Sequence, residues 1–307
     1  MSASSRLQQE IEQQAGVLRA VLPRQVDVLD QARAAIAASR RTLLVGIGSS
    51  RHVAAYGAAC LDALTGVAVT LLPSPGATVP LPRFGPGDVV VIVSQSGQTP
   101  GLLPLVNAAR TAGALLVTVT NTDGSLLEQA ADLALVTGAG PESVVPATKS
   151  VTASMLLLRA LATPPSAAAV EALAEAIDEV VEQTWAFALP RVVVAGGFAA
   201  EAVSDEVALK LAEVCGALVV AETLVDYLHG PAAVPAAVLA FLDKDDPNAA
   251  ALDGRPDVLR IDSSCGEPTL DAILRVVIGQ CLALRWARDA GMDPDDPRGL
   301  DKVTLTL

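Results

Sequence analysis

Lysine, histidine and aromatic residues are all scarce in this chain of 307 residues. Four lysines stand against seventeen arginines, aromatic residues make up 3% of the sequence, and there are two histidines. A lysine can lose its proton and act as a nucleophilic amine, whereas arginine stays charged. Each lysine therefore calls for a chemical interpretation as well as a solvation one: Lys149, Lys210, Lys244 and Lys302.

Basic clusters and long spanning segments are also absent. The formal net charge is −13 and no run of lysine or arginine occurs, so we expect no nucleic-acid partner. One long uncharged stretch, Ala63 to Pro82, contains four prolines and cannot be a straight membrane helix. The polar first residues lack a signal-peptide core, so we expect a cytoplasmic protein with no membrane partner. The four cysteines lack metal or redox spacing, and we expect neither a metal nor a cofactor.

Short apolar runs alternate with alanine-rich helical patterns along the chain. This order predicts an α/β protein with parallel sheets covered by helices. The expected strands of a first sheet are Thr42–Ile47, Ala68–Leu72, Val89–Ser94, Leu115–Thr120 and Leu133–Val136. The expected strands of a second sheet are Arg191–Gly196, Ala217–Ala221, Ala237–Leu242 and Val258–Ile261.

The clearest break between the two sets is Thr163-Pro164-Pro165-Ser166, which indicates two similar halves. An opening helix, Leu7 to Leu22, is expected to belong to neither sheet. The expected division is a helical segment at 1–28, domains at 29–165 and 166–292, and a tail at 293–307.

Two loops rich in hydroxyl groups follow strands of the first half, where open α/β sheets bind ligands. One is Gly46-Ile47-Gly48-Ser49-Ser50 and the other runs from Ser94 to Thr99 as SQSGQT. Their serines and threonines could be ordinary helix N-caps. Because two such loops end strands of one sheet, we favour a phosphate site built from amides and hydroxyls.

Other charged residues have competing interpretations. Lys149 is either a surface lysine or a partner of Glu142. Lys210 and Glu213 share a helix face, which is typical of a surface ion pair but also provides an acid–base pair. His229 lies in a His-Gly-Pro turn, where a histidine ordinarily has a structural role. Lys302 lies near the end of the chain, where a lysine is ordinarily exposed to solvent.

Several of these segments together resemble a known family. SQSGQT, ESVVPATKS, ALKLAEV followed by His229-Gly230-Pro231, and DPRGLDKVTLTL are similar to motifs in the isomerase half of glucosamine-6-phosphate synthase and its relatives with two SIS (sugar isomerase) domains. The resemblance covers nearly the whole chain. It implies two tandem SIS domains, each a parallel sheet flanked by helices in a flavodoxin-like three-layer sandwich.

The resemblance also implies roles for individual residues. Glu213 would move a proton between C1 and C2 of the sugar, and Lys302 would form a Schiff base with the keto sugar. Lys210 would lie beside the reacting oxygens, and His229 would assist ring opening from the partner subunit of a homodimer. The phosphate and sugar hydroxyls would be held by Ser49, Ser50, Ser94, Gln95, Ser96 and Thr99, and the sugar pocket lined by the backbone of Val145 and Ala147.

Some positions depart from the family pattern. Ser49, Ala147 and Ala212 stand where the synthase has threonine, serine and lysine, which leaves the identity of the sugar open. We expect no glutaminase domain here, because no such domain precedes the isomerase half. The leading hypothesis is an isomerase/deaminase of an amino-sugar 6-phosphate, with glucosamine 6-phosphate as first substrate. The alternatives are a fructosamine-6-phosphate deglycase and a sugar-phosphate-binding protein without catalysis.

Overall fold

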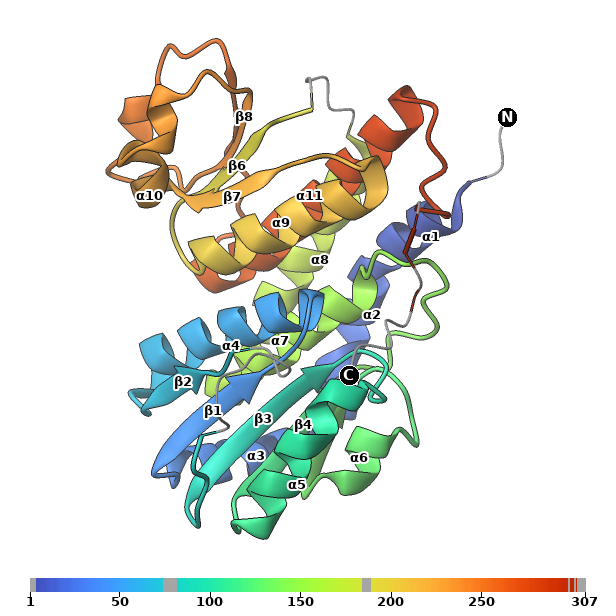
Figure 1. The fold of residues 1–307 in the computed structure, drawn as a ribbon, viewed down its shortest axis with the longest axis vertical. Helices are drawn as coiled ribbons and strands as arrows, with labels where there is room; N and C mark the ends of the chain where they lie inside the picture. The colour runs from blue at the N-terminus through green and yellow to red at the C-terminus, as the bar shows by residue number, and fades with distance from the viewer. Residues whose placement is uncertain (1–3, 74–81, 184–188, 298, 301, 303–307) are drawn as a thin grey trace. The chain divides into compact units, whose positions relative to one another are not determined.

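The computed structural model describes residues 4–73, 82–183, 189–297, 299–300 and 302. The chain forms two compact units, each with its own sheet (Figure 1). The first-sheet unit contains Gly16–Glu142 and Lys149–Ser166. The second-sheet unit contains Met1–Ala15, Ser143–Thr148 and Ala167–Lys302. The short segment Ser143–Thr148 therefore belongs to a different unit from the residues on either side of it.

The first sheet is entirely parallel, with strand order β2-β1-β3-β4-β5. Leu43, Val90 and Leu116 share a face and pack in one apolar cluster, while their neighbours Leu44, Val91 and Val117 are equally buried. Both faces are therefore covered, as the near-continuous apolar runs predicted. The strands are β1 Arg41–Val45, β2 Val69–Leu71, β3 Asp88–Ser94, β4 Leu115–Thr120 and β5 Leu133–Val136.

The helices of this unit cover the two faces of the sheet. The crossovers from β1 to β2 and from β3 to β4 run in opposite directions from the centre of the sheet, so right-handed connections place their helices on opposite faces. On one face α4 (Ser49–Thr65) packs on α7 (Lys149–Ala162), and α7 contacts α3 (Val26–Ala37). On the other face lie α5 (Leu103–Thr111) and α6 (Leu126–Ala130).

The second sheet is parallel as well, with strand order β7-β6-β8-β9. Its strands are β6 Val192–Ala195, β7 Val220–Thr223, β8 Val238–Phe241 and β9 Val258–Ile261. Helix α9 (Ala200–Cys215) packs on α11 (Pro268–Asp289) so closely that a Cβ on Gly279 would lie 2.5 Å from a methyl carbon of Val207. The remaining helices are α8 (Ala167–Glu182) and α10 (Leu224–Leu228). The two parallel sheets flanked by helices confirm the predicted fold class.

The prediction of one opening helix that belongs to neither sheet was wrong. The segment forms two helices, α1 (Arg6–Glu12) and α2 (Gln14–Val21), with Gln13 between them. Helix α1 packs against α11 and α8 of the second-sheet unit. It buries Leu7 and Ile11, each about 1% exposed, and this apolar contact accounts for its place in that unit.

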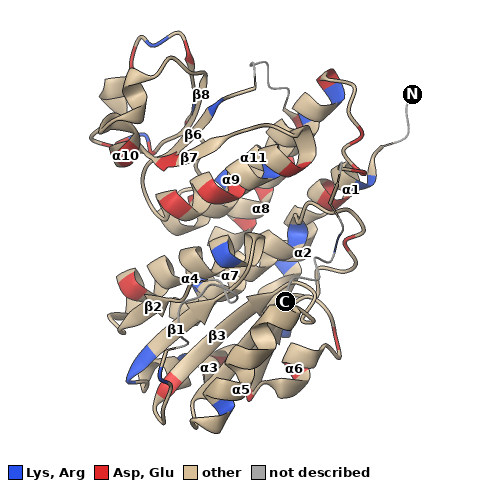
Figure 2. Cartoon of the chain, in the orientation of Figure 1, with Lys and Arg blue, Asp and Glu red and all other residues tan. Residues whose placement is uncertain are grey.

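Acidic and basic residues are interspersed over both units, and no element carries a long run of cations (Figure 2). None of the helices in the described part of the chain is both long and apolar enough to span a membrane. Among the described residues, no group of three or more histidines, cysteines, aspartates or glutamates is arranged to hold a metal ion.

Asp88, the first residue of β3, is a buried carboxylate with two arginine partners. It accepts hydrogen bonds from Arg40 Nη2 at 2.7 Å, from Arg41 Nε at 3.1 Å and Nη2 at 3.0 Å, and from the amide of Gly85 at 3.0 Å. The hydrogen bonds from Arg41 lower the pKa of Asp88 below its ordinary value, and burial opposes them. The folded protein therefore binds fewer protons at this site than the unfolded chain does.

We expect Asp88→Asn to lower the free energy of unfolding by about 2 kcal/mol at neutral pH, the scale of hydrogen bonds to a charged group. Because the folded pKa is depressed, this stabilisation is complete above the ordinary pKa of about 4 and is lost as the pH falls through the folded value. Urea unfolding of both proteins between pH 3 and pH 7 measures the difference. A difference that stays constant over this range would contradict the assignment.

Candidate functional site

The first hydroxyl-rich loop joins β1 to α4. A Cβ on Gly46 would lie 2.2 Å from the carbonyl oxygen of Ser50, so only glycine permits this turn. Gly48 has a φ of 59° and is the N-cap of α4, without a side-chain hydrogen bond. Ser49 and Ser50 are thus the first helical residues, and the N-cap alternative is wrong for them. They lie at the N-terminus of a 17-residue helix, where the helix dipole favours an anion.

The second hydroxyl-rich loop follows β3, the neighbour of β1 in the sheet. Ser94 is the last residue of the strand and is buried, with its Oγ 3.0 Å from Oγ1 of Thr99. The Oγ of Ser96 accepts a hydrogen bond from the amide of Gln98 at 3.2 Å, which forms a local turn. Neither serine is a helix N-cap. Thr99 is the N-cap of the short helix Pro100–Leu102, but its side chain makes no capping hydrogen bond.

This second loop is fixed to the loop after β4. Gly97 has a φ of 61°, and a Cβ there would lie 2.2 Å from Oγ of Ser125. The carbonyl of Gln95 accepts a hydrogen bond from the amide of Asn121 at 3.0 Å. The two hydroxyl-rich loops therefore follow adjacent parallel strands of one sheet. They contain the six residues predicted to hold the phosphate: Ser49, Ser50, Ser94, Gln95, Ser96 and Thr99.

Helix α9 carries a cluster of one lysine and two glutamates, most of it buried. Nζ of Lys210 lies 2.5 Å from Oε2 of Glu213 and 3.5 Å from Oε1 of Glu206. The side chains of Lys210 and Glu206 are each 1% exposed, and that of Glu213 is 17% exposed. The surface ion pair considered from the sequence is therefore wrong, because the ammonium is fully buried between two carboxylates.

Glu206 is a member of this cluster that the sequence analysis missed. It stands four residues before Lys210 on the same helix, the spacing at which glutamate and lysine side chains meet. Of the two carboxylates, Glu213 retains access to solvent, whereas Glu206 is enclosed. This arrangement fits a base at Glu213, with the ammonium beside it able to stabilise negative charge on a nearby oxygen.

Four further residues predicted for the site belong to the second-sheet unit: His229, Lys302, Val145 and Ala147. His229 is exposed and is the C-cap of α10, which confirms the predicted turn at a helix end. Lys302 is half-buried, so its side chain is not that of a fully solvated lysine. Val145 and Ala147 are half-buried and alternate with buried Val144, Pro146 and Thr148 in the segment Ser143–Thr148. The predicted residues thus fall into two groups, one in each unit.

Lys149, at the start of α7 in the first-sheet unit, is about 3% exposed, which rules out the surface alternative. Glu142 accepts hydrogen bonds from the amide of Ser150 at 3.0 Å and from its hydroxyl at 2.5 Å. The carboxylate of Glu142 therefore accepts hydrogen bonds from the first turn of α7.

The corresponding edge of the second sheet has a different chemistry. A cavity of about 590 Å³ lies at the ends of β8 and β9, and five aspartates line it together with Ser263 and Ser264. A Cβ on Gly196 would lie 2.2 Å from a carboxylate oxygen of Asp246, and one on Gly197 would overlap the carboxylate of Asp243. The buried guanidinium of Arg275 pairs with Asp243. The two sheets therefore differ at the edge where α/β proteins bind ligands.

Three of the four cysteines have thiols that stay protonated at neutral pH. Burial raises the pKa of Cys215 to about 11 and the pKa values of Cys265 and Cys281 to about 12. The thiol form is a weak nucleophile, so these side chains behave as small apolar groups.

Comparison with known proteins finds one family that matches part of the chain. Residues 35–164 match the SIS domain family. The chain is 32% identical to a glutamine–fructose-6-phosphate aminotransferase (isomerizing) from Aeropyrum pernix, over 89% of this chain and 52% of that protein. A second such aminotransferase, from Leifsonia xyli, is 27% identical over 84% of this chain and 50% of that protein. The chain thus spans about half the length of these relatives.

Solved structures share the fold over nearly the full chain. A protein from Silicibacter pomeroyi assigned provisionally as a phosphosugar isomerase is 27% identical, with a TM-score of 0.80 over 95% of this chain and all of that one. The glucosamine-6-phosphate deaminase of Thermotoga maritima is 22% identical, with a TM-score of 0.77 over 98% of this chain and all of that one. The segment 35–164, which matches the SIS domain family, contains both hydroxyl-rich loops.

Proposed function

We propose that the protein is a phosphosugar isomerase that acts on an amino-sugar 6-phosphate, with glucosamine 6-phosphate as its first candidate substrate. The buried Lys210–Glu213 pair carries this proposal, because it joins a solvent-accessible carboxylate to an enclosed ammonium. Support also comes from the two hydroxyl-rich loops of the SIS domain and from the aminotransferase and deaminase to which the chain is similar.

In the proposed reaction the loops containing Ser49 and Ser94 bind the phosphate. Glu213 removes the proton from C2 of the open-chain amino sugar and returns a proton to C1, while the oxygen at C1 gains a proton and the amine nitrogen loses one. The C1 aldehyde and the C2 amine thereby become a C1 hydroxyl and a C2 imine. Lys210 stabilises the negative charge that develops on the oxygen at C1. Lys302 displaces ammonia from C2 as a Schiff base, and water then releases fructose 6-phosphate and the free lysine.

His229 would assist ring opening from the partner subunit of a homodimer. Its exposure on α10 supports this role, as does the exposure of nearby Val225 and Val234, which are 51% and 61% exposed. Exposed apolar side chains beside a polar group are typical of protein interfaces. Sedimentation as a monomer at the concentration used for the assay would remove this role from His229.

The proposed activity is tested by incubating the protein with glucosamine 6-phosphate and measuring both ammonia and fructose 6-phosphate. We expect the two products in equal amounts, because each molecule of glucosamine 6-phosphate reacts with one water to give one fructose 6-phosphate and one ammonia. Fructosamine 6-phosphate is the parallel substrate: turnover of it by a Lys302→Ala variant at the full rate would indicate a deglycase instead. Tight binding of sugar phosphates with no turnover would indicate a binding protein.

A further inference from the structure

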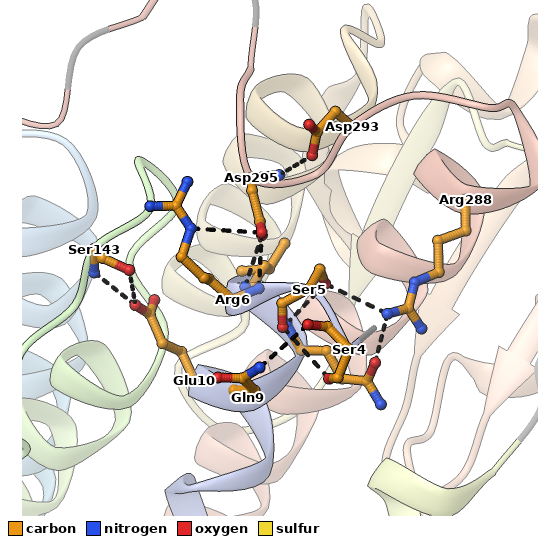
Figure 3. Close-up of polar contacts among 11 residues, drawn as sticks. Ser4, Ser5, Arg6, Gln9, Glu10, Ser143, Arg288, Asp293 and Asp295 are labelled. Carbon is orange, nitrogen blue, oxygen red and sulfur yellow. Dashed lines mark hydrogen bonds and ion pairs between the residues drawn. The ribbon is translucent and has the colours of Figure 1, made fainter. Parts of the chain in front are cut away.

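Glu10 is a buried carboxylate on α1 that contacts a segment far away in the sequence. Its side chain is enclosed, with the residue about 5% exposed. One oxygen, Oε1, accepts hydrogen bonds from both the amide of Ser143, at 2.6 Å, and its hydroxyl, at 3.1 Å (Figure 3). Because a carboxylate is charged, its hydrogen bonds are about twice as strong as those between neutral groups. Glu10 thus fixes both the backbone and the side chain of Ser143.

Helix α1 is itself held in place at several points. Asp295 accepts hydrogen bonds from the amides of Arg6 and Leu7, each at 2.8 Å, and so caps the N-terminus of the helix (Figure 3). Nη2 of Arg288 on α11 donates to Oε1 of Gln8 at 2.5 Å. Helix α1 also buries Leu7 and Ile11, so the position of Glu10 on this helix is fixed by several contacts.

Ser143 begins the segment Ser143–Thr148, which we call the sugar loop because Val145 and Ala147 belong to it. The loop forms no helix or strand, so no ladder of backbone hydrogen bonds defines its conformation. Its chain neighbours on both sides, Glu142 and Lys149, belong to the first-sheet unit. Within the second-sheet unit the hydrogen bonds from Ser143 to Glu10 therefore anchor the start of the loop.

We propose that Glu10 is a positioning residue that fixes the conformation of the sugar loop for substrate binding. This inference rests on the proposed function, because it assigns the loop's backbone to the sugar. Glu10 touches no reacting atom in this role. It acts through Ser143, and its loss should weaken substrate binding more than it slows the chemical step.

The same helix provides a matched control. Glu12 lies two residues further along α1, is exposed, and accepts a hydrogen bond from Gln8 Nε2 at 2.5 Å rather than one from the loop. Glu10→Ala and Glu12→Ala make the same chemical change on the same helix. Glu10→Gln keeps an oxygen acceptor without the charge and is the conservative variant.

Two measurements are made on these variants: hydrogen–deuterium exchange of a peptide covering Ser143–Thr148, and KM and kcat for glucosamine 6-phosphate. We expect Glu10→Ala to exchange about tenfold faster in this peptide, the factor that corresponds to a lost hydrogen bond. Its KM should rise about tenfold with kcat changed less than threefold. Glu10→Gln should recover part of both effects, and Glu12→Ala should match the wild type.

Unchanged exchange in Glu10→Ala would overturn the inference. So would an equal rise in KM for Glu12→Ala, because the effect would then come from the stability of α1 in general. Failure of the proposed function has a different signature, namely a wild type that neither binds nor turns over the sugar phosphate. That outcome overturns the sugar-binding role of the loop even where exchange shows that Glu10 anchors it.

Discussion

Replacement of Glu213 by glutamine should reduce kcat for glucosamine 6-phosphate by about 10³-fold, within the range measured for loss of a general acid–base group. The amide has the shape of the carboxylate but cannot take up a proton from C2. Its oxygen can still accept a hydrogen bond from Lys210, whose Nζ lies 2.5 Å from Oε2 in the native protein. The fold and the affinity for substrate should therefore change little.

Release of ammonia and fructose 6-phosphate measures the turnover of this variant, and NMR in D2O measures its exchange of the C2 proton. Both should fall together, because the same proton transfer limits them. Glu201→Gln is the matched control: Glu201 is an exposed glutamate on the same helix and is expected to be neutral. A Glu213→Gln variant with wild-type turnover would show that the base lies elsewhere.

The second large effect is on stability. We expect Lys210→Met to lower the free energy of unfolding of the second-sheet unit by about 3–5 kcal/mol, the cost of removing one member of a buried ion pair. The loss arises because Glu206 is 1% exposed and its Oε1 lies 3.5 Å from the ammonium. Methionine matches the lysine stem in length, so packing should be largely retained.

A second substitution separates charge from packing in this cluster. The double variant Lys210→Met with Glu206→Gln also removes the buried negative charge of Glu206 and should regain most of the lost stability. Urea unfolding followed by tryptophan fluorescence is suitable, because Trp286 is buried on α11 of the second-sheet unit. A single variant that loses less than about 1 kcal/mol would show that water reaches Glu206.

The strands were the part of the fold most accessible from the sequence. Short runs rich in apolar residues mark the strands, and Leu115–Thr120, Leu133–Val136 and Val258–Ile261 were predicted with the bounds that the structure has. The opening helix was less accessible. Helix α1 packs against α8 and α11, and a tertiary contact of this kind leaves no local pattern in the sequence.

Burial of charge was the main feature of the site that the sequence could not supply. The spacing of Lys210 and Glu213 fixes a shared helix face but not whether that face is exposed or buried. The same spacing rule would have found Glu206 had it been applied in the N-terminal direction. Glu10 was beyond reach, because its partner Ser143 is 133 residues away in the chain.

The way in which the chain passes between the two units limits how its gene can be divided. A cut in the Pro-rich segment 163–166 would give two fragments with one sheet each, yet the N-terminal fragment would carry residues 1–15 and 143–148 that belong to the other unit. The C-terminal fragment would lack α1, the sugar loop and the apolar contacts of Leu7 and Ile11. A cut at one point in the chain therefore leaves neither unit complete. A recombinant protein that carries the whole second-sheet unit must include all three of its segments.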